Sequence, residues 1–86
     1  MKASHILVST KEQADAILAE ANALNFGSLA QIHSACPSKA NGGDLGEFGP
    51  GMMVKPFEDA TVATPIGSIS QPVQTQFGFH LIHRTG

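Results

Sequence analysis

The sequence is poor in the residues that mark several common classes of protein. It contains one cysteine, Cys36, so no disulfide can form within the chain, and such sparse use of cysteine is typical of a reducing compartment. No apolar run approaches the roughly 18 residues of a membrane-spanning helix, and no apolar signal-peptide segment follows Lys2. We therefore expect a cytoplasmic protein that does not associate with membranes.

Net charge is low as well. The chain has 5 Lys and Arg against 7 Asp and Glu, which gives a formal net charge of −2. The basic residues form no stripe that could neutralise phosphates, so we expect no nucleic-acid partner. With 86 residues the chain can build one modest hydrophobic core but not two, and residues 1–86 are predicted to form a single domain.

Motifs for phosphate and metal binding are missing too. The segment from Ser38 to Gly51 is rich in glycine but contains neither G-x-x-x-x-G-K-[ST] nor G-x-G-x-x-G, so its glycines are better explained by turns and close backbone approach. The histidines do not follow metal-ligand spacing, and His80 and His83 would lie on opposite faces of a strand. We expect no metal and no cofactor.

The local patterns predict an α+β fold with a mostly antiparallel sheet. Ser9 and Thr10 can cap a helix with Glu12 and Gln13 at capping-box spacing. In chain order, the predicted elements are a strand at 3–8, a helix at 11–25, a short helix capped by Ser28, a short strand at 45–48, a helix from Pro56 to Ala63, an edge strand near Pro72 and a strand at 78–84. Of the apolar helical residues, Leu24, Leu29 and Ile32 are among those expected to be buried.

Two histidines stand in otherwise apolar strands. His5 belongs to the stretch SHILV and His80 to TQFGFHLIH. A buried imidazole needs hydrogen-bond partners, because an unpaired buried polar group costs about 1–3 kcal/mol. If the first and last strands are neighbours in the sheet, the two rings can meet and serve as each other's partner. His33 and His83 are interpreted as surface or rim residues.

Three blocks of the sequence, HILV, GGDLGEFGPGMMVKPFEDA and TQFGFHLI, resemble the parvulins in order, spacing and composition. The resemblance covers essentially the whole chain and is closest to the minimal, single-domain bacterial form. It implies the parvulin variant of the FKBP-like superfold, a four-stranded antiparallel sheet surrounded by three or four helices. It also implies a peptidyl-prolyl cis/trans isomerase that acts non-covalently on the X–Pro bonds of polypeptides and assists their folding. We expect the enzyme to be a monomer.

The resemblance also assigns roles to individual residues. It implies an active-site histidine pair with a cysteine and a hydroxyl beside it, and an apolar pocket for the proline ring. The catalytic set is His5, Cys36, Thr75 and His80, and the substrate-binding set is Leu45, Met53, Phe57 and Phe77. Strand-like alternation would direct Met52 away from this pocket.

Two other interpretations use the same residues. Cys36 could be a nucleophile with His5 or His80 as its base, or simply a small packing residue, although the family accepts Asp at this position. The whole groove could belong to a non-catalytic module or chaperone that only binds proline-containing peptides. The expected residues stand at all the positions named above, which favours the enzyme.

One branch of the family prefers phosphorylated Ser or Thr before proline and binds the phosphate with a basic loop after the first strand. Here only Ser9 and Thr10 occupy that connection, and Lys11 is followed at once by Glu12. A phosphate dianion is held tightly only by several charge-assisted bonds. The sequence predicts an enzyme that is not phospho-specific and favours uncharged residues before proline.

Overall fold

Four strands form one antiparallel sheet in the order β2–β1–β4–β3. The computed structural model describes the backbone of residues 1–86 and all side chains except that of Ser38. The elements are β1 (Lys2–Val8), α1 (Lys11–Glu20), α2 (Phe26–His33), the 3-10 helix η1 (Pro37–Asn41), β2 (Asp44–Glu47), α3 (Lys55–Ala63), β3 (Val73–Thr75) and β4 (Gly78–Arg84). The predicted α+β fold is confirmed.

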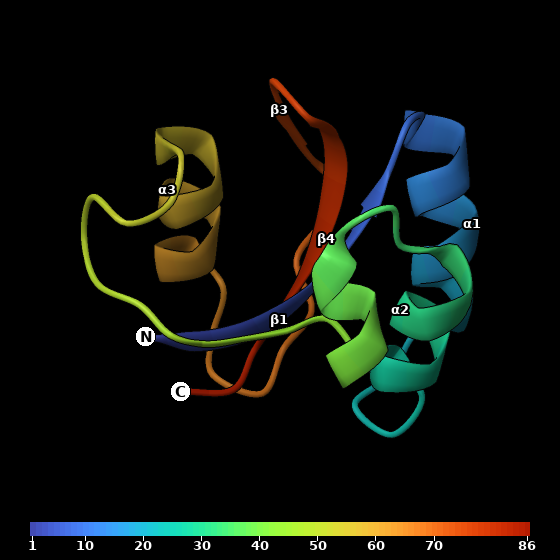
Figure 1. The fold of residues 1–86 in the computed structure, drawn as a ribbon, viewed down its shortest axis with the longest axis horizontal. Helices are drawn as coiled ribbons and strands as arrows, with labels where there is room; N and C mark the ends of the chain where they lie inside the picture. Colours follow the sequence, from blue (N-terminus) through green and yellow to red (C-terminus); the bar gives the residue numbers. More distant parts are fainter.

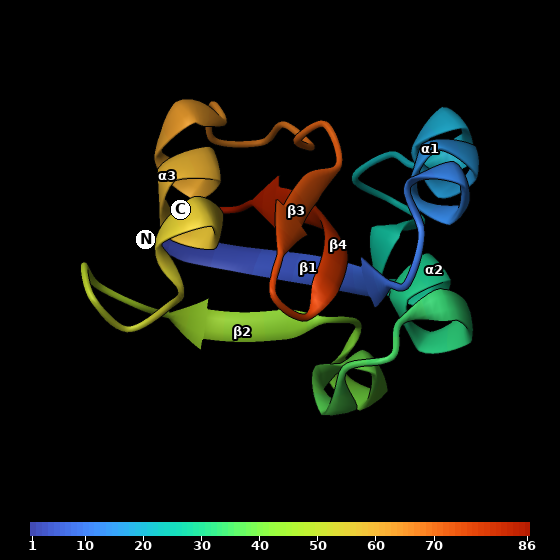
Figure 2. The same ribbon diagram turned by 90° about the horizontal axis from the view of Figure 1, so that it is seen from above.

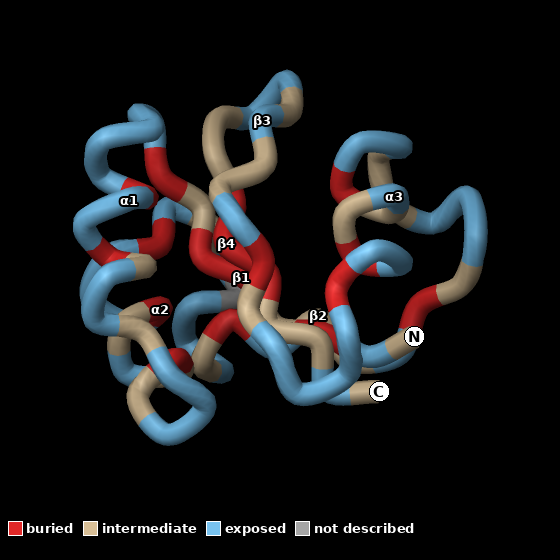
Figure 3. The backbone as a smooth tube through the Cα atoms, turned by 180° about the vertical axis from the view of Figure 1, so that it is seen from behind, coloured by how far each residue is buried: buried red, intermediate tan, exposed pale blue. Residues whose placement is uncertain are grey.

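Helices cover both faces of the sheet. Figure 1 shows α1 and α2 on one side and α3 on the other. In Figure 2, which views the molecule from above, the two groups again lie at opposite ends, with β1 and β4 between them. Figure 3 shows that burial is concentrated in these two central strands. A site on either face is therefore built on the most buried part of the backbone.

Strand alternation divides the apolar residues of β1 between two cores. Ile6 and Val8 pack with α1 and α2, whereas Ala3 packs with Phe57 of α3. Because side chains alternate along a strand, His5 lies on the same face as Ala3. Both histidines of interest belong to the α3 side of the sheet, since the neighbouring Ile82 of β4 packs there too.

The first helix begins as predicted and ends earlier. Thr10 and Gln13 form the expected capping box. The helix stops at Glu20 instead of residue 25, because the Asn22 side chain accepts hydrogen bonds from the backbone N–H groups of the next turn. Leu24 is 97% exposed, so its predicted burial is wrong.

The second helix begins at Phe26, with Asn25 rather than Ser28 before its first residue. Its buried residues are Phe26 and Ala30, and Leu29 packs against them. The predicted burial of Ile32 is wrong, since this side chain is 72% exposed. No helix in the described part of the chain is both long enough and apolar enough to cross a bilayer.

The C-terminal half follows the predicted pattern closely. Pro56 lies in the first turn of α3, where its missing N–H costs no helical hydrogen bond. Pro72 directly precedes β3, which is an edge strand as expected. The guanidinium of Arg84 donates to three carbonyls near the C-terminal end of α3, those of Thr61, Val62 and Thr64, at 3.3–3.4 Å.

The first and last residues of the chain lie side by side (Figures 1 and 2). The Lys2 N–H donates to the Gly86 carbonyl at 3.0 Å, and the Thr85 N–H donates to the Lys2 carbonyl at 2.8 Å. The two ends are thus joined by backbone hydrogen bonds.

Candidate active site

The two strand histidines meet, as the sequence predicts. In the antiparallel pairing of β1 with β4, His5 lies opposite Ile82 and Leu7 lies opposite His80, so the two rings are diagonal neighbours on one face. Their Nδ1 atoms are 3.0 Å apart and both residues are buried. The ring planes are within 17° of parallel, and the ring centroids are 5.2 Å apart.

Thr75 extends this pair into a chain of hydrogen bonds. Its Oγ1 lies 2.8 Å from Nε2 of His80 and also accepts the backbone N–H of Phe77 at 3.1 Å. Two neutral rings satisfy the Nδ1–Nδ1 bond in either direction, with one ring donating and the other accepting. If both rings were charged, two N–H donors would face each other at this distance, so the geometry excludes a doubly protonated pair.

Burial holds both rings in their neutral forms. Burial, together with the positive charge that His80 would carry, lowers the pKa of His5 from 6.5 to about 4. Burial also lowers the pKa of His80. At neutral pH the pair therefore presents uncharged imidazoles to the space above it.

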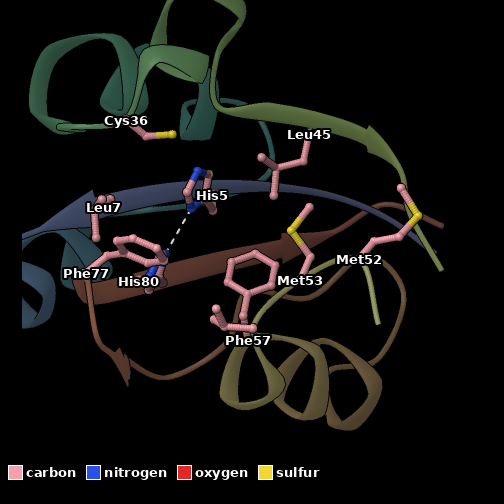
Figure 4. Close-up of a pocket in the computed structure, with 10 residues that line it drawn as sticks. His5, Leu7, Cys36, Leu45, Met52, Met53, Phe57, Phe77 and His80 are labelled. Carbon is pink, nitrogen blue, oxygen red and sulfur yellow. Dashed lines mark hydrogen bonds between the residues drawn. The ribbon is translucent and has the colours of Figure 1, made fainter. Parts of the chain in front are cut away.

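That space is a cavity of about 400 Å³ on the α3 side of the sheet (Figure 4). Seven of the eight predicted site residues line it, and Thr75 is connected to it through His80. The lining consists of His5, Leu7, Cys36, Leu45, Met52, Met53, Val54, Phe57, Phe77 and His80. Most of these side chains are apolar, and the polar groups come from the histidine pair and Cys36.

Phe57 joins the cavity to the core beneath it. Its ring meets both imidazoles edge to face, with centroids 5.6 Å from His5 and 5.2 Å from His80. On another side it contacts Phe48, with centroids 6.1 Å apart. Phe57 is only 2% exposed, so it supports the histidine pair as well as lining the cavity.

Ser34, which the sequence analysis did not single out, organises the other side of the cavity. Its buried hydroxyl accepts the backbone N–H of Leu7 at 3.0 Å and that of Cys36 at 3.3 Å. It thereby fixes the end of α2 against β1 and places Cys36 at the cavity wall. A serine that bonds only to backbone has no sequence signal. Leu7, in contrast, could have been found from its alternation with His5.

Residues 49–54 also differ from the prediction. The expectation that Met52 points elsewhere is wrong, because these residues form a turn and not a strand, so alternation does not apply. Figure 4 shows Met52 at the outer end of the cavity, beyond Met53. Val54, which was also missed, lines the cavity just before α3 begins.

The cavity is suited to holding a compact apolar group beside the two imidazoles, which remain uncharged. Small ligand sites commonly combine an apolar lining with a few placed polar groups, as here. Among the described residues, no three His, Cys, Asp or Glu side chains gather as metal ligands.

Comparison with known proteins gives a consistent result. The rotamase family model, described as a PPIC-type PPIase domain, matches residues 5–86. The foldase protein PrsA 4 of Bacillus cereus is 46% identical over 87 residues, which cover 99% of this chain and 31% of that protein. The chain spans about a third of the length of the PrsA relatives it matches.

Solved structures agree in fold. The crystal structure of the peptidylprolyl isomerase PrsA from Bacillus anthracis aligns with a TM-score of 0.93 and 44% identity, covering 100% of this chain and 41% of that one. The solution structure of NmPin, the parvuline of Nitrosopumilus maritimus, aligns with a TM-score of 0.86 and 44% identity, covering 100% and 95% of the two chains.

Proposed function

Because the chain belongs to the PPIC-type rotamase family, the parvulins, we propose that it catalyses cis/trans isomerisation of X–Pro bonds in polypeptides. The reaction forms no covalent intermediate and uses no cofactor. The observation that carries the proposal is the apolar cavity closed at its floor by two neutral histidines.

The chemistry follows from the electronic structure of the amide. Rotation about the X–Pro bond crosses a resonance barrier of about 18–20 kcal/mol. Near the top of this barrier the nitrogen is no longer conjugated with the carbonyl, so the carbonyl is less polar than in the planar ground state. A cavity that excludes water favours the twisted form over the planar one, and this difference in binding lowers the barrier.

The lining residues divide this task between them. Met53, Phe57 and Phe77 hold the proline ring, and Leu45 closes the edge of its pocket. The carbonyl before proline is then free to swing over the polar side of the cavity, which consists of Cys36 and the histidine pair. Thr75 and the hydrogen bonds within the pair keep the imidazoles stationary while the substrate rotates.

Exchange NMR on a short unmodified proline peptide tests the proposal. Substoichiometric protein should broaden the cis and trans resonances, whereas a peptide with alanine in place of proline should remain unaffected. The rival interpretation is a module that binds proline peptides without catalysing their exchange. Chemical-shift changes on the protein without faster exchange of the peptide would favour that module and refute the enzyme.

We expect no preference for phosphorylated substrates. In a peptide series that differs only in the residue before proline, apolar residues should react faster than phosphothreonine. The connection after β1 offers Lys11 alone, and this lysine is already paired with Asp15 at 2.8 Å. A phosphate dianion would therefore gain little. Faster turnover of the phosphothreonine peptide would contradict this prediction and point to a basic surface elsewhere.

The Cys36→Asp variant should retain much of the activity. Cys36 is partly exposed at the cavity wall. In the proposed mechanism this side chain contributes only a polar group of suitable size. Cys36→Ala serves as the control that lacks both the polarity and the volume of the thiol. Mass spectrometry of protein mixed with substrate should find no covalent adduct; an adduct through Cys36 would establish a nucleophilic mechanism instead.

The cellular role is also a proposal. Relatives named foldase support a role in protein folding. A cytoplasmic location is supported by the single cysteine, and cell fractionation tests it. A monomeric state is supported by a cavity built from one chain, and sedimentation tests it.

A further inference from the structure

The loop between β2 and α3 carries part of the cavity wall, and a helix residue holds it in place. Met52 and Met53 lie in this loop and line the cavity. Just before them, the Gly51 N–H donates to Oε1 of Glu58 at 2.7 Å. Glu58 lies outside the cavity lining, in the first turn of α3.

Glu58 is well placed to act as an anchor. It directly follows Phe57, which is fixed in the core, and its own N–H donates to the Val54 carbonyl at 3.1 Å. A carboxylate in the first turn of a helix is favoured by the unpaired N–H groups there. The bond to Gly51 therefore joins the loop to the helix that supplies the aromatic part of the cavity.

The loop closes its own turn, and its hydrogen bond to α3 is made through Glu58. The Met52 N–H donates to the Gly49 carbonyl at 3.2 Å, and Sδ of Met52 accepts the Gly49 N–H, also at 3.2 Å. These contacts link loop residues only to each other. The charge-assisted bond from Gly51 to Glu58 ties the closed turn to α3.

We propose that Glu58 is a positioning residue for the substrate pocket: by accepting the Gly51 N–H, it places Met53 against the proline ring and Met52 at the outer end of the cavity. The proposal rests on the isomerase function proposed above. In this role Glu58 affects substrate binding and does not contact the reacting atoms.

Three variants test this role. Glu58→Ala removes the acceptor and should lower kcat/KM roughly tenfold, mainly through a higher KM, because the methionines are no longer held in place. Glu58→Gln keeps an acceptor and should restore most of the loss. Asp59→Asn is the matched control, since it removes the neighbouring carboxylate, which pairs with the exposed Lys55 and does not reach the loop.

The amide resonance of Gly51 gives a readout that general destabilisation would not mimic. It should move upfield in Glu58→Ala and stay near its original position in Glu58→Gln and Asp59→Asn. An unchanged KM and an unchanged Gly51 resonance in Glu58→Ala would overturn the proposal. An inactive wild-type protein would refute the isomerase function instead, and the affinity of the same variants for a proline peptide would still test the role of Glu58.

Discussion

The Phe57→Ala variant should lose about 3–5 kcal/mol of its free energy of unfolding, the usual cost of removing a buried aromatic ring. Phe57 supports Phe48 on one side and both imidazoles on the other, so the cavity it leaves also frees the histidine pair to move. For a domain of this size the melting temperature should fall by more than 10 °C, since each kcal/mol is worth about 4–8 °C.

Because Phe57→Ala could be largely unfolded at 25 °C, Phe57→Leu is the variant for activity measurements. It should fold and yet show a clearly raised KM for proline peptides. Phe77→Ala is the control: this ring is 60% exposed, so its loss should weaken catalysis and leave the melting temperature nearly unchanged. A wild-type melting temperature in Phe57→Ala would show that the ring is not part of the core.

The second large effect is expected from the histidine pair. His5→Ala and His80→Ala should each lose roughly 2–3 kcal/mol of stability, because Nδ1 of the remaining buried ring loses its hydrogen bond to the other imidazole. The double variant should lose less than the sum of the two, since the bond between the two Nδ1 atoms can be lost only once. Both single variants should lower kcat/KM roughly 10–100-fold by loosening the cavity floor. Unchanged melting temperatures in both would contradict the pairing.

The pair also predicts how stability depends on pH. Both pKa values are lower in the folded protein than the 6.5 of a free histidine, so the unfolded chain binds more protons as the pH falls below 6.5. The free energy of unfolding should therefore decrease between pH 6.5 and about 4, by about 3 kcal/mol from His5 alone. Denaturant titrations across this range should show the decrease in the wild type and a smaller one in His5→Ala.

The histidine pair was the most predictable part of the site. In β1 and β4 the polar ring stands among aliphatic residues, and alternation alone places each ring on a definite face. The sequence prediction had to assume that the first and last strands are neighbours in the sheet. The structure shows that they are. Thr75 was identified through the family resemblance, because nothing in its local sequence distinguishes it from a surface threonine.

The errors have physical causes that a single sequence does not reveal. Leu24 continues the apolar spacing of α1, but the side chain of Asn22 offers the backbone a competing turn, and the helix ends. The direction of the Met52 side chain was predicted from strand alternation, but its segment forms a turn. Ser34 and Glu58 act on backbone N–H groups, and these contacts become visible only once the fold brings the partners together.

The adjacency of the two chain ends has a mechanical consequence. Ala3 pairs with Arg84 and Ser4 with His83, so β1 and β4 form an antiparallel ladder that opens at the termini. A force pulling the ends apart would load these backbone bonds one after another, as in unzipping, and not all at once as in shear. The next pair along this ladder joins His5 to Ile82. Tension between the ends would thus reach the cavity floor once the bonds of Lys2 to Thr85 and Gly86 and two strand pairs have opened, and pulling on the termini should open the domain at low force.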